Sequence, residues 1–245
     1  MTQRHAVVTG GGKGIGRGVS LRLAADGHRV SVLGRDENAL AAVVAMAPRA
    51  IEAHVCDVAD EASITAVFGA LERVDVLVNN AGIASSAPTG RATLADWESL
   101  MRVNATGVFL CTRAVIDQMR ARGSGRIVTV ASVASHHGMP YIGSYAASKH
   151  AALGFMRTVA AELRRTGVTA NCVCPAYVRT EMAEHAIGNV VRAGRAAEDA
   201  AEVLNPALGR LIEVDEVAAA VAFLISDAAA AINGQSIIID GGASV

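Results

Sequence analysis

The stretch that decides the fold is Thr9–Gly16, TGGGKGIG, which directly follows the apolar run Ala6–Val8 and leads into a helical pattern. The glycines recur as Gly10-x-x-x-Gly14-x-Gly16 rather than in the strict G-x-G-x-x-G spacing. A glycine-rich turn between a strand and a helix lets the backbone approach a ligand closely, and the N–H groups and dipole of the helix N-terminus favour a phosphate. A merely flexible turn is the alternative, but the position at the first strand-to-helix junction favours a dinucleotide site.

Outward from this stretch, short β-branched runs alternate with longer helical patterns along the chain. Most strand candidates are continuously apolar, as in strands that a parallel sheet buries on both faces. The alternation predicts a single α/β domain over residues 1–245, with a Rossmann-type doubly wound, mostly parallel seven-stranded sheet and helices on both faces. The expected strands are Ala6–Thr9, Val30–Leu33, Ile51–Cys56, Val76–Asn79, Arg126–Ala131, Val168–Cys174 and Ser236–Ile239. The expected helices are Ile15–Ala25, Glu37–Met46, Ser63–Leu71, Asp96–Arg120, Tyr145–Arg165 and Val214–Ile225.

The composition argues against several classes of function. Of 245 residues, 52% are hydrophobic and 18% are charged, and the formal net charge is -1. Nucleic-acid binding usually needs a basic stripe, which the chain lacks, so no nucleic-acid partner is expected. The longest uncharged apolar runs, such as Val217–Ile225, are too short to cross a bilayer, and no apolar signal segment precedes the first strand. A soluble cytoplasmic protein without a membrane partner is therefore expected.

The four cysteines form neither a disulfide framework nor a metal-binding pattern. Cys172 and Cys174 lie two apart in an expected strand, so their side chains point to the same sheet face. Because no histidine or second cysteine pair stands at zinc spacing, the thiols are interpreted as buried apolar side chains, and no metal site is expected.

One segment differs from the rest of the chain in its composition and hydrophobic periodicity. Residues 181–209 are rich in Ala, Glu and Arg, weakly periodic, and interrupted by Gly188, Gly194 and Pro206. A long insertion before the last helix is typical of a mobile lid, so we expect a substrate lid at about this position.

The end of the second expected strand, Val32–Asp36 (VLGRD), bears on the choice of dinucleotide. Enzymes that use NAD usually have an acid there for the ribose 2′-hydroxyl, whereas enzymes that use NADP have an arginine for the 2′-phosphate. If Gly34 occupies the strand end, Arg35 can bond the phosphate as a fork, and Lys13 adds a second positive charge. We interpret the pattern as NADP(H) binding. The alternative makes Asp36 the ribose ligand of NAD, although Asp36 is equally suited to capping the helix that follows.

Tyr145 is the only tyrosine with a lysine four residues later, in Tyr145-Ala-Ala-Ser-Lys149. On a helix this spacing places both side chains on one face, a turn apart. Because a nearby ammonium favours phenolate, we expect Lys149 to lower the pKa of Tyr145 and to ease proton exchange with an alcohol or ketone oxygen. Ser132 follows the expected strand Arg126–Ala131 at the edge where parallel sheets bind ligands, so its hydroxyl can hold the reacting oxygen. A chance Y-x-x-x-K with a solvent-facing lysine is the alternative.

With these residues the chain resembles the short-chain dehydrogenase/reductase family from end to end. Thr9–Gly16 resembles the family's TGxxxGxG motif, and Asn79–Gly82 matches its NNAG motif, which supports the central sheet and flanks the adenosine ribose. The resemblance implies an oxidoreductase that transfers a hydride between NADP(H) and a carbonyl or secondary alcohol. It also implies a catalytic tetrad in which the asparagine bends a helix and holds a water in a proton relay to the lysine. The tetrad residues are Asn104, Ser132, Tyr145 and Lys149.

The same resemblance assigns the cofactor contacts. Lys149 would also hold the nicotinamide ribose hydroxyls, and Thr180 would bond the carboxamide. Asp57 and Val58, which follow the third expected strand, would lie against the adenine, with a helix cap in the run Asp57–Asp60 as the alternative. The expected cofactor-binding residues are Gly10, Gly12, Lys13, Gly14, Ile15, Gly16, Arg35, Asp57, Val58, Asn80, Ala81, Gly82, Tyr145, Lys149, Pro175, Val178 and Thr180.

One position departs from the family pattern. The Pro-Gly that follows the sixth strand in the family is Pro175-Ala176 here. The added methyl group either narrows the floor of the site, the surface on which the nicotinamide is expected to rest, or shifts the backbone if the position needs a positive φ. An altered substrate fit is expected rather than a loss of activity.

The substrate class is suggested by the general sequence similarity of one region and not by a specific motif. The region from Ser144 to Pro175 is most similar to 3-oxoacyl thioester reductases and to aromatic polyketide ketoreductases, which implies an acyl thioester of a carrier protein or CoA. One alternative is a secondary-alcohol dehydrogenase or ketone reductase for a substrate that is not a thioester, linked to NADP or NAD. The other is a non-catalytic NADP(H)-binding sensor or partner subunit. Related enzymes are commonly tetramers built on the helices expected at Asp96–Arg120 and Tyr145–Arg165, so a homotetramer is expected.

Overall fold

The computed structural model describes residues 3–192, 204–205 and 207–244. Seven strands form one sheet in the order β3-β2-β1-β4-β5-β6-β7, and every neighbouring pair is parallel. This confirms the predicted doubly wound sheet. Because the order reverses between β1 and β4, the connections after these strands diverge and leave a crevice at their carboxyl ends. The strands are β1 (His5–Thr9), β2 (Arg29–Gly34), β3 (Ile51–Val55), β4 (Val76–Asn79), β5 (Gly125–Val130), β6 (Val168–Pro175) and β7 (Ser236–Ile239).

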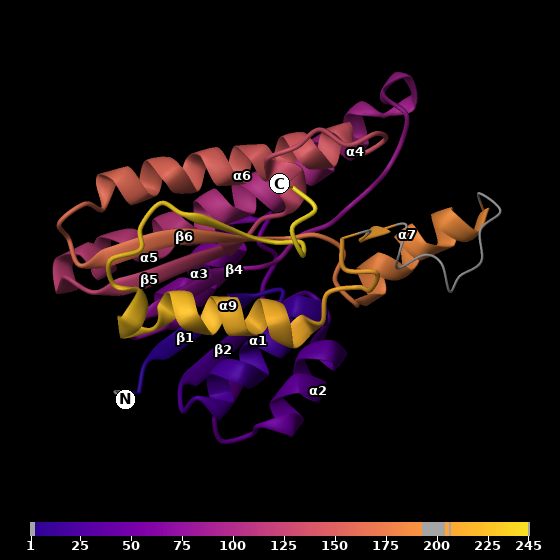
Figure 1. Ribbon diagram of the computed structural model, residues 1–245. Helices are drawn as coiled ribbons and strands as arrows, with labels where there is room; N and C mark the ends of the chain where they lie inside the picture. Colours follow the sequence, from indigo (N-terminus) through magenta and orange to yellow (C-terminus); the bar gives the residue numbers. More distant parts are fainter. Residues whose placement is uncertain (1–2, 193–203, 206, 245) are drawn as a thin grey trace.

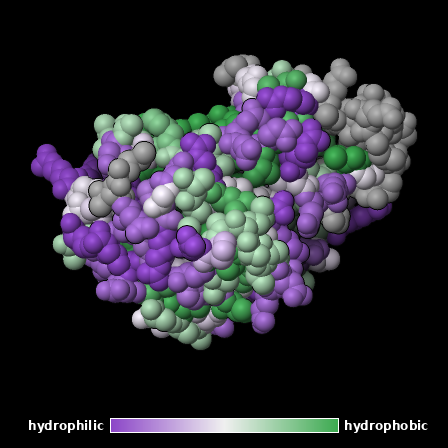
Figure 2. Space-filling model, turned by 90° about the horizontal axis from the view of Figure 1, so that it is seen from below, coloured by the Kyte–Doolittle hydropathy of each residue, from purple (hydrophilic) through white to green (hydrophobic). Residues whose placement is uncertain are grey.

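Helices cover both faces of the sheet (Figure 1). One face carries α1 (Gly14–Ala25), α2 (Glu37–Met46) and α9 (Val214–Ile225), whose apolar side chains form one buried core with β1 and β2. The other face carries α3 (Glu61–Ala70), α5 (Gly107–Arg122) and α6 (Gly143–Glu162), which form the second core. Beyond the carboxyl edge of the sheet lie α4 (Leu94–Met101) and α7 (Glu181–Arg192). Figure 2 shows mostly polar side chains with smaller apolar areas on the face seen from below, as expected for helices that bury one side.

The helix expected over Asp96–Arg120 is not continuous. It consists of α4, a π-helical turn over Arg102–Thr106 and α5. Within that turn the side chain of Asn104 pairs with both backbone groups of Ile83, accepting its N–H and donating to its carbonyl oxygen, each at 2.9 Å. Gly107 then allows close packing, because a Cβ there would lie 3.0 Å from Val58. The hydrophobic periodicity of the sequence does not reveal these long-range contacts, and it therefore predicted one continuous helix.

Other differences lie at element ends. The helix expected over Tyr145–Arg165 begins at Gly143 and ends at Glu162. The helix expected from Ser63 begins at Glu61, because Asp60 caps it by accepting the N–H of Ala62 at 3.0 Å. The remaining boundaries agree within one or two residues, and those of β4, β7, α2 and α9 are identical to the prediction.

The described residues contain no helix that is both long and apolar enough to cross a membrane. In the same part of the chain, no group of three or more His, Cys, Asp or Glu side chains is placed to hold a metal ion.

All four cysteines are free and buried, which confirms their interpretation as apolar filling. Burial raises the pKa of Cys172 to about 12 and that of Cys174 to about 11, and it also raises the pKa values of Cys56 and Cys111. Because only the thiolate reacts, the native protein should label with Ellman's reagent far more slowly than a small thiol at pH 8. Denaturation in guanidinium should then release four reactive thiols, and rapid labelling of the native protein would contradict this burial.

Candidate active site

The glycine turn after β1 is shaped by contacts that exclude side chains. Gly10 has a φ of +63°, and a Cβ there would lie 2.9 Å from the Cα of Ala81. A Cβ on Gly16 would collide with the carbonyl oxygen of Gly10. Thr9 ties the turn to the end of β4, because its hydroxyl oxygen accepts the backbone N–H groups of Asn80 and Ala81, each at 3.0 Å. The turn is thus held rigidly against the neighbouring strand at the crevice.

This turn opens directly onto the N-terminus of α1. Lys13 is the N-cap residue, and its side chain does not cap the helix. The first-turn N–H groups therefore have no side-chain cap and remain suited to an anion. Gly14, with a φ of +50°, lies beside Thr180, whose Cγ2 is 3.2 Å from the position that a Cβ on Gly14 would occupy. The structure thereby brings Thr180 to the glycine turn, as its predicted role at the cofactor requires.

The charged residues after β2 lie at the same edge. Asp36 caps α2 by accepting the N–H of Ala39 at 3.0 Å, which confirms the capping interpretation. Its carboxylate also lies 2.9 Å from the Nζ of Lys13. The guanidinium of Arg35 is two-thirds exposed and lies 3.9 Å from the carboxylate of Asp57.

Asp57 and Val58 occupy the loop after β3. The Asp57 side chain accepts the N–H of Ala59 at 2.9 Å, and the helix cap in the run Asp57–Asp60 is Asp60. The side chain of Val58 is buried in the core against Gly107. Only the backbone of Val58 can therefore take part in the predicted adenine contact.

Tyr145 and Lys149 lie on the same face of α6, as predicted. The Nζ of Lys149 is 5.9 Å from the centre of the Tyr145 ring, and the amine is buried. Ser132, two residues after β5, lies near enough to Tyr145 for its side chain to lower the pKa of the phenol. Its hydroxyl oxygen also accepts the N–H of Ala134 at 3.2 Å, which holds the start of the following 3-10 turn, η3 (Val133–Ser135). The structure therefore places a hydroxyl pair and an amine together at the crevice.

The electrostatics of this group differ from the sequence expectation. Burial raises the pKa of Tyr145, and the nearby side chain of Ser132 only partly offsets this effect. Burial also lowers the pKa of Lys149 to about 8, and the amine donates to the carbonyl oxygen of Val130 at 3.0 Å. The expectation of a lowered pKa for Tyr145 is therefore wrong, because burial of the phenol disfavours its charged form and raises the pKa. The phenol keeps its proton at neutral pH, which is the form that a proton donor needs.

Asn104 approaches the same group from the π-helical turn. Its amide donates to the hydroxyl of Ser148 at 3.0 Å, and Ser148 in turn donates to the carbonyl oxygen of Tyr145 at 2.7 Å. A Cβ on Gly82 would lie 3.2 Å from Oδ1 of Asn104 and 3.4 Å from Nζ of Lys149. Gly82 therefore lets the two side chains converge. The four predicted tetrad residues are brought to one site.

The family comparison follows from this arrangement. The sequence model described as short chain dehydrogenase matches residues 4–189, which is most of the chain. The chain belongs to the short-chain dehydrogenase family. It is an oxidoreductase of that family, as the resemblance implied.

Three relatives and two solved structures give the similarity its detail. A putative ketoacyl reductase of granaticin polyketide synthesis from Streptomyces violaceoruber is 39% identical, covering 97% of this chain and 92% of the relative. The 3-oxoacyl-[acyl-carrier-protein] reductase of a Synechocystis strain is 39% identical, with 99% and 97% covered. Levodione reductase from Leifsonia aquatica is 38% identical, covering 99% of this chain and 95% of the relative. The crystal structure of a levodione reductase aligns with a TM-score of 0.90 at 38% identity, covering 99% of this chain and 98% of that one. The structure of a variant actinorhodin polyketide ketoreductase with NADPH aligns with a TM-score of 0.91 at 36% identity over 98% and 97%.

In this short-chain dehydrogenase, the departure at Pro175-Ala176 does not strain the backbone. Ala176 is absent from the non-glycine residues with positive φ, which among the described residues are Tyr141 and Arg165. Its N–H donates to the carbonyl oxygen of Ile239 at 2.9 Å, which continues the pairing of β6 with β7. Ala176 therefore has an ordinary backbone conformation, and both expected effects of its methyl group stay predictions.

Two contacts at the site were not expected from the sequence. Ser148 links Asn104 to the backbone of Tyr145, and no sequence spacing indicates this link because Asn104 and Ser148 lie on different helical segments. The sulfur of Cys174 lies 3.6 Å from Nε2 of His136, which joins the loop after Ser132 to β6. No sequence spacing indicates this second contact, because it depends on the packing of the loop.

The predicted lid is described only in part. Its first portion forms α7, which begins immediately after Thr180. Residues 193–203 and 206, which belong to the expected segment 181–209, lie outside the described residues. The lid role stays a prediction.

Proposed function

We propose that this short-chain dehydrogenase uses NADP(H) and interconverts a ketone and a secondary alcohol, with a 3-oxoacyl thioester of a carrier protein or CoA as the ketone. The observation that carries the proposal is the convergence of Ser132, Tyr145 and Lys149 on one site, where the amine of Lys149 lies 5.9 Å from the centre of the Tyr145 ring. The thioester is supported by relatives named as ketoacyl and 3-oxoacyl-[acyl-carrier-protein] reductases.

The cofactor is supported by the fit of the chain's own residues. The glycine positions leave no room for side chains beside the uncapped N-terminus of α1, which suits a pyrophosphate. Arg35 and Lys13 provide the positive charge that a 2′-phosphate requires. A structurally similar ketoreductase was solved with NADPH.

In this mechanism the protein binds and protonates the reacting oxygen. The hydride would come from a bound NADPH, which the glycine turn, Lys13 and Arg35 would hold in the crevice. The hydroxyls of Ser132 and Tyr145 donate hydrogen bonds to the carbonyl oxygen and stabilise the negative charge that develops there, which is usually the largest contribution to catalysis. Tyr145 then gives its proton to that oxygen. Lys149, with a pKa of about 8, can replenish the phenol, and Asn104 fixes the backbone on which this relay depends.

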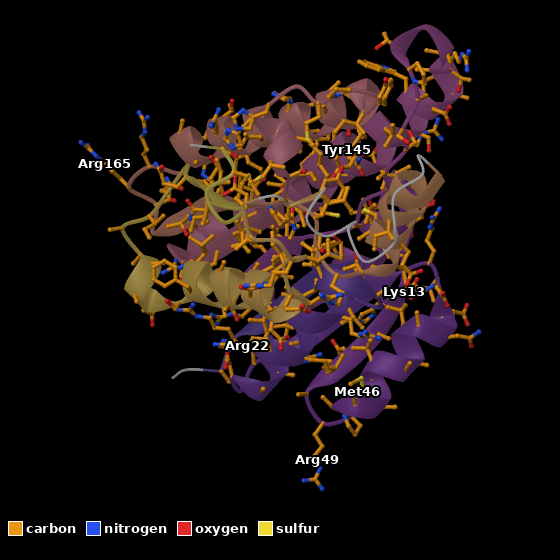
Figure 3. All side chains as sticks on the ribbon, turned by 45° about the vertical axis from the view of Figure 1, so that its right-hand side comes forward. Lys13, Arg22, Met46, Arg49, Tyr145 and Arg165 are labelled. Carbon is orange, nitrogen blue, oxygen red and sulfur yellow. The ribbon has the colours of Figure 1, made fainter. Side chains whose placement is uncertain are left out.

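The cofactor assignment makes a direct prediction for Arg35. Arg35→Asp should lower kcat/KM with NADPH at least tenfold, because losing a charge-assisted contact and adding repulsion exceeds about 1.4 kcal/mol. The matched control is Arg49→Asp, an exposed arginine just beyond the far end of α2 (Figure 3), which should stay within about twofold of the wild type by the same arithmetic. Both cofactors are compared through the absorbance of the reduced nicotinamide. An unchanged preference between NADPH and NADH in the Arg35 variant rejects the assignment.

The substrate class is tested by a panel with both cofactors. Acetoacetyl-CoA should be reduced with a higher kcat/KM than simple aryl or cyclic ketones. The second candidate is a ketone reductase or secondary-alcohol dehydrogenase for a substrate that is not a thioester, favoured by the 38% identity to levodione reductase. A preference for the cyclic ketones supports that candidate instead. A non-catalytic sensor would turn over neither class.

We propose further that the enzyme is a cytoplasmic homotetramer. The support is a groove of about 640 Å³ along α4 and α5, lined by Trp97 and Phe109, which are 43% and 39% exposed. Exposed aromatic side chains on adjacent helices favour partner packing. Light scattering coupled to size-exclusion chromatography tests the assembly, and a monomeric mass rejects it.

A further inference from the structure

Two adjacent residues of β6 hold both ends of the short turn that begins at Ser132. The carbonyl oxygen of Val173 accepts the N–H of Ala131 at 2.8 Å, directly before Ser132. The sulfur of Cys174 lies 3.6 Å from Nε2 of His136, the residue that directly follows η3. The position of Ser132 is therefore fixed between one backbone contact and one side-chain contact with the same strand.

The contact between Cys174 and His136 has a defined donor and a defined acceptor. Burial raises the pKa of the Cys174 thiol to about 11, so the thiol keeps its proton. Burial lowers the pKa of His136, and the positive charge of Arg157 adds to this effect, so the ring is neutral at pH 7. A neutral imidazole has one nitrogen that can accept, and Nε2 is the nitrogen that faces the sulfur. We therefore assign the thiol as the donor and Nε2 as the acceptor.

Cys174 lies among the groups of the active site. Its thiol is fully buried in the core that β6 forms with α6, and the two elements lie side by side in Figure 1. The backbone of Ser132 is close enough to lower the pKa of the thiol, although burial outweighs this effect. The thiol is also close enough to Lys149 to influence the pKa of the amine, which burial lowers to about 8. A close-packed side chain moves little, so Cys174 gives the turn a rigid point of attachment.

From this geometry we propose that His136 and Cys174 are positioning residues, which hold the hydroxyl of Ser132 where it meets the reacting oxygen. The inference rests on the proposed function, in which Ser132 stabilises the developing negative charge. Such stabilisation requires a donor that is already in place, and a small displacement of a catalytic group costs much of its effect. Because this interaction is strongest in the transition state, losing the contact should lower kcat and leave the KM for the ketone nearly unchanged.

Removing either partner should lower kcat by about threefold to tenfold, which is the range of one ordinary hydrogen bond. His136→Phe keeps a ring without the acceptor nitrogen, and Cys174→Ala removes the donor. The double variant should be no slower than the slower single variant, because both changes remove the same contact. The matched control is His137→Phe, at the exposed neighbour on the same loop, which should stay within about twofold of the wild type. Rates are measured with NADPH and the best ketone of the panel at neutral pH.

Two further measurements distinguish positioning from a general loss of packing. His136→Gln keeps an acceptor in its side-chain oxygen, so its kcat should return to within about twofold of the wild type. In the background of Ser132→Ala, His136→Phe should not lower kcat further, since the hydroxyl that it positions is already gone. Circular dichroism and the dissociation constant for NADP+ report whether each variant is folded. If Cys174→Ala is not folded, the variants of His136, which lies on a half-buried loop, decide the question.

The outcomes separate this inference from the proposed function. If the wild type reduces the ketone and His136→Phe is equally fast, the contact does not position Ser132 and the inference is overturned. A fall in kcat that is just as large in the Ser132→Ala background also overturns it, because the effect would then not act through the serine. If the wild type reduces no ketone of the panel, the proposed function fails and the inference falls with it.

Discussion

Replacing Tyr145 with phenylalanine is expected to lower kcat for ketone reduction by about 10³-fold. General acid catalysis by a positioned side chain contributes roughly 10² to 10⁴, and this hydroxyl also helps to bind the developing negative charge. The phenol suits this role because burial keeps it protonated at neutral pH and the side chain of Ser132 lies near it. The measurement is single-turnover and steady-state consumption of NADPH with the best ketone of the panel.

The matched control is Tyr141→Phe. Tyr141 lies on the loop before α6 and is 65% exposed, so losing its hydroxyl should change kcat less than about twofold. The dissociation constant for NADP+ should be nearly unchanged in both variants, which separates loss of chemistry from loss of folding. A Tyr145 variant that reduces the ketone as fast as the wild type would show that another group donates the proton.

The layout of the sheet was predictable because its strands are continuously apolar and its helix starts carry recognisable caps. The predicted bounds of the strand Val76–Asn79 are those of β4, in which every residue is buried. Glu37–Met46 is bounded correctly since Asp36 is a capping residue placed immediately before it. The order of Ser132, Tyr145 and Lys149 was also sufficient to predict that they meet, because parallel strands end at one edge and a spacing of four residues follows one helix face.

The remaining features depend on contacts that only the folded chain creates. The π-helical turn is fixed by the bonds between Asn104 and Ile83, which are 21 residues apart. The ion pair of Lys13 and Asp36 joins two different strand-to-helix junctions. The pKa of Tyr145 is set by burial, which spacing along a helix does not reveal, so the sequence indicated the neighbouring amine but not the desolvation that raises the pKa.

The buried amine of Lys149 should make the enzyme active at the expense of its stability. Lys149→Met is expected to lower kcat/KM at least 100-fold, because it removes both the proton relay to Tyr145 and the predicted ribose contact. At pH 7 the same variant should be more stable than the wild type by about 2 kcal/mol. The folded-state pKa of about 8, against the ordinary lysine value of 10.5, corresponds to a cost of about 3 kcal/mol for burying the ammonium. The lost hydrogen bond to Val130 offsets about 1 kcal/mol of that gain.

The pH dependence of stability identifies the cause. Since the folded-state pKa of Lys149 is lowered, the unfolded chain binds more protons between about pH 8 and 10.5, and the free energy of unfolding contributed by this residue rises across that interval. The advantage of Lys149→Met should therefore be largest below pH 8 and shrink towards pH 10, as measured by urea unfolding at several pH values. Lys13→Met, at the chain's other, exposed lysine, should change stability by less than about 1 kcal/mol at pH 7. If Lys149→Met is less stable than the wild type at pH 7, the amine stabilises the fold, and desolvation does not dominate the site.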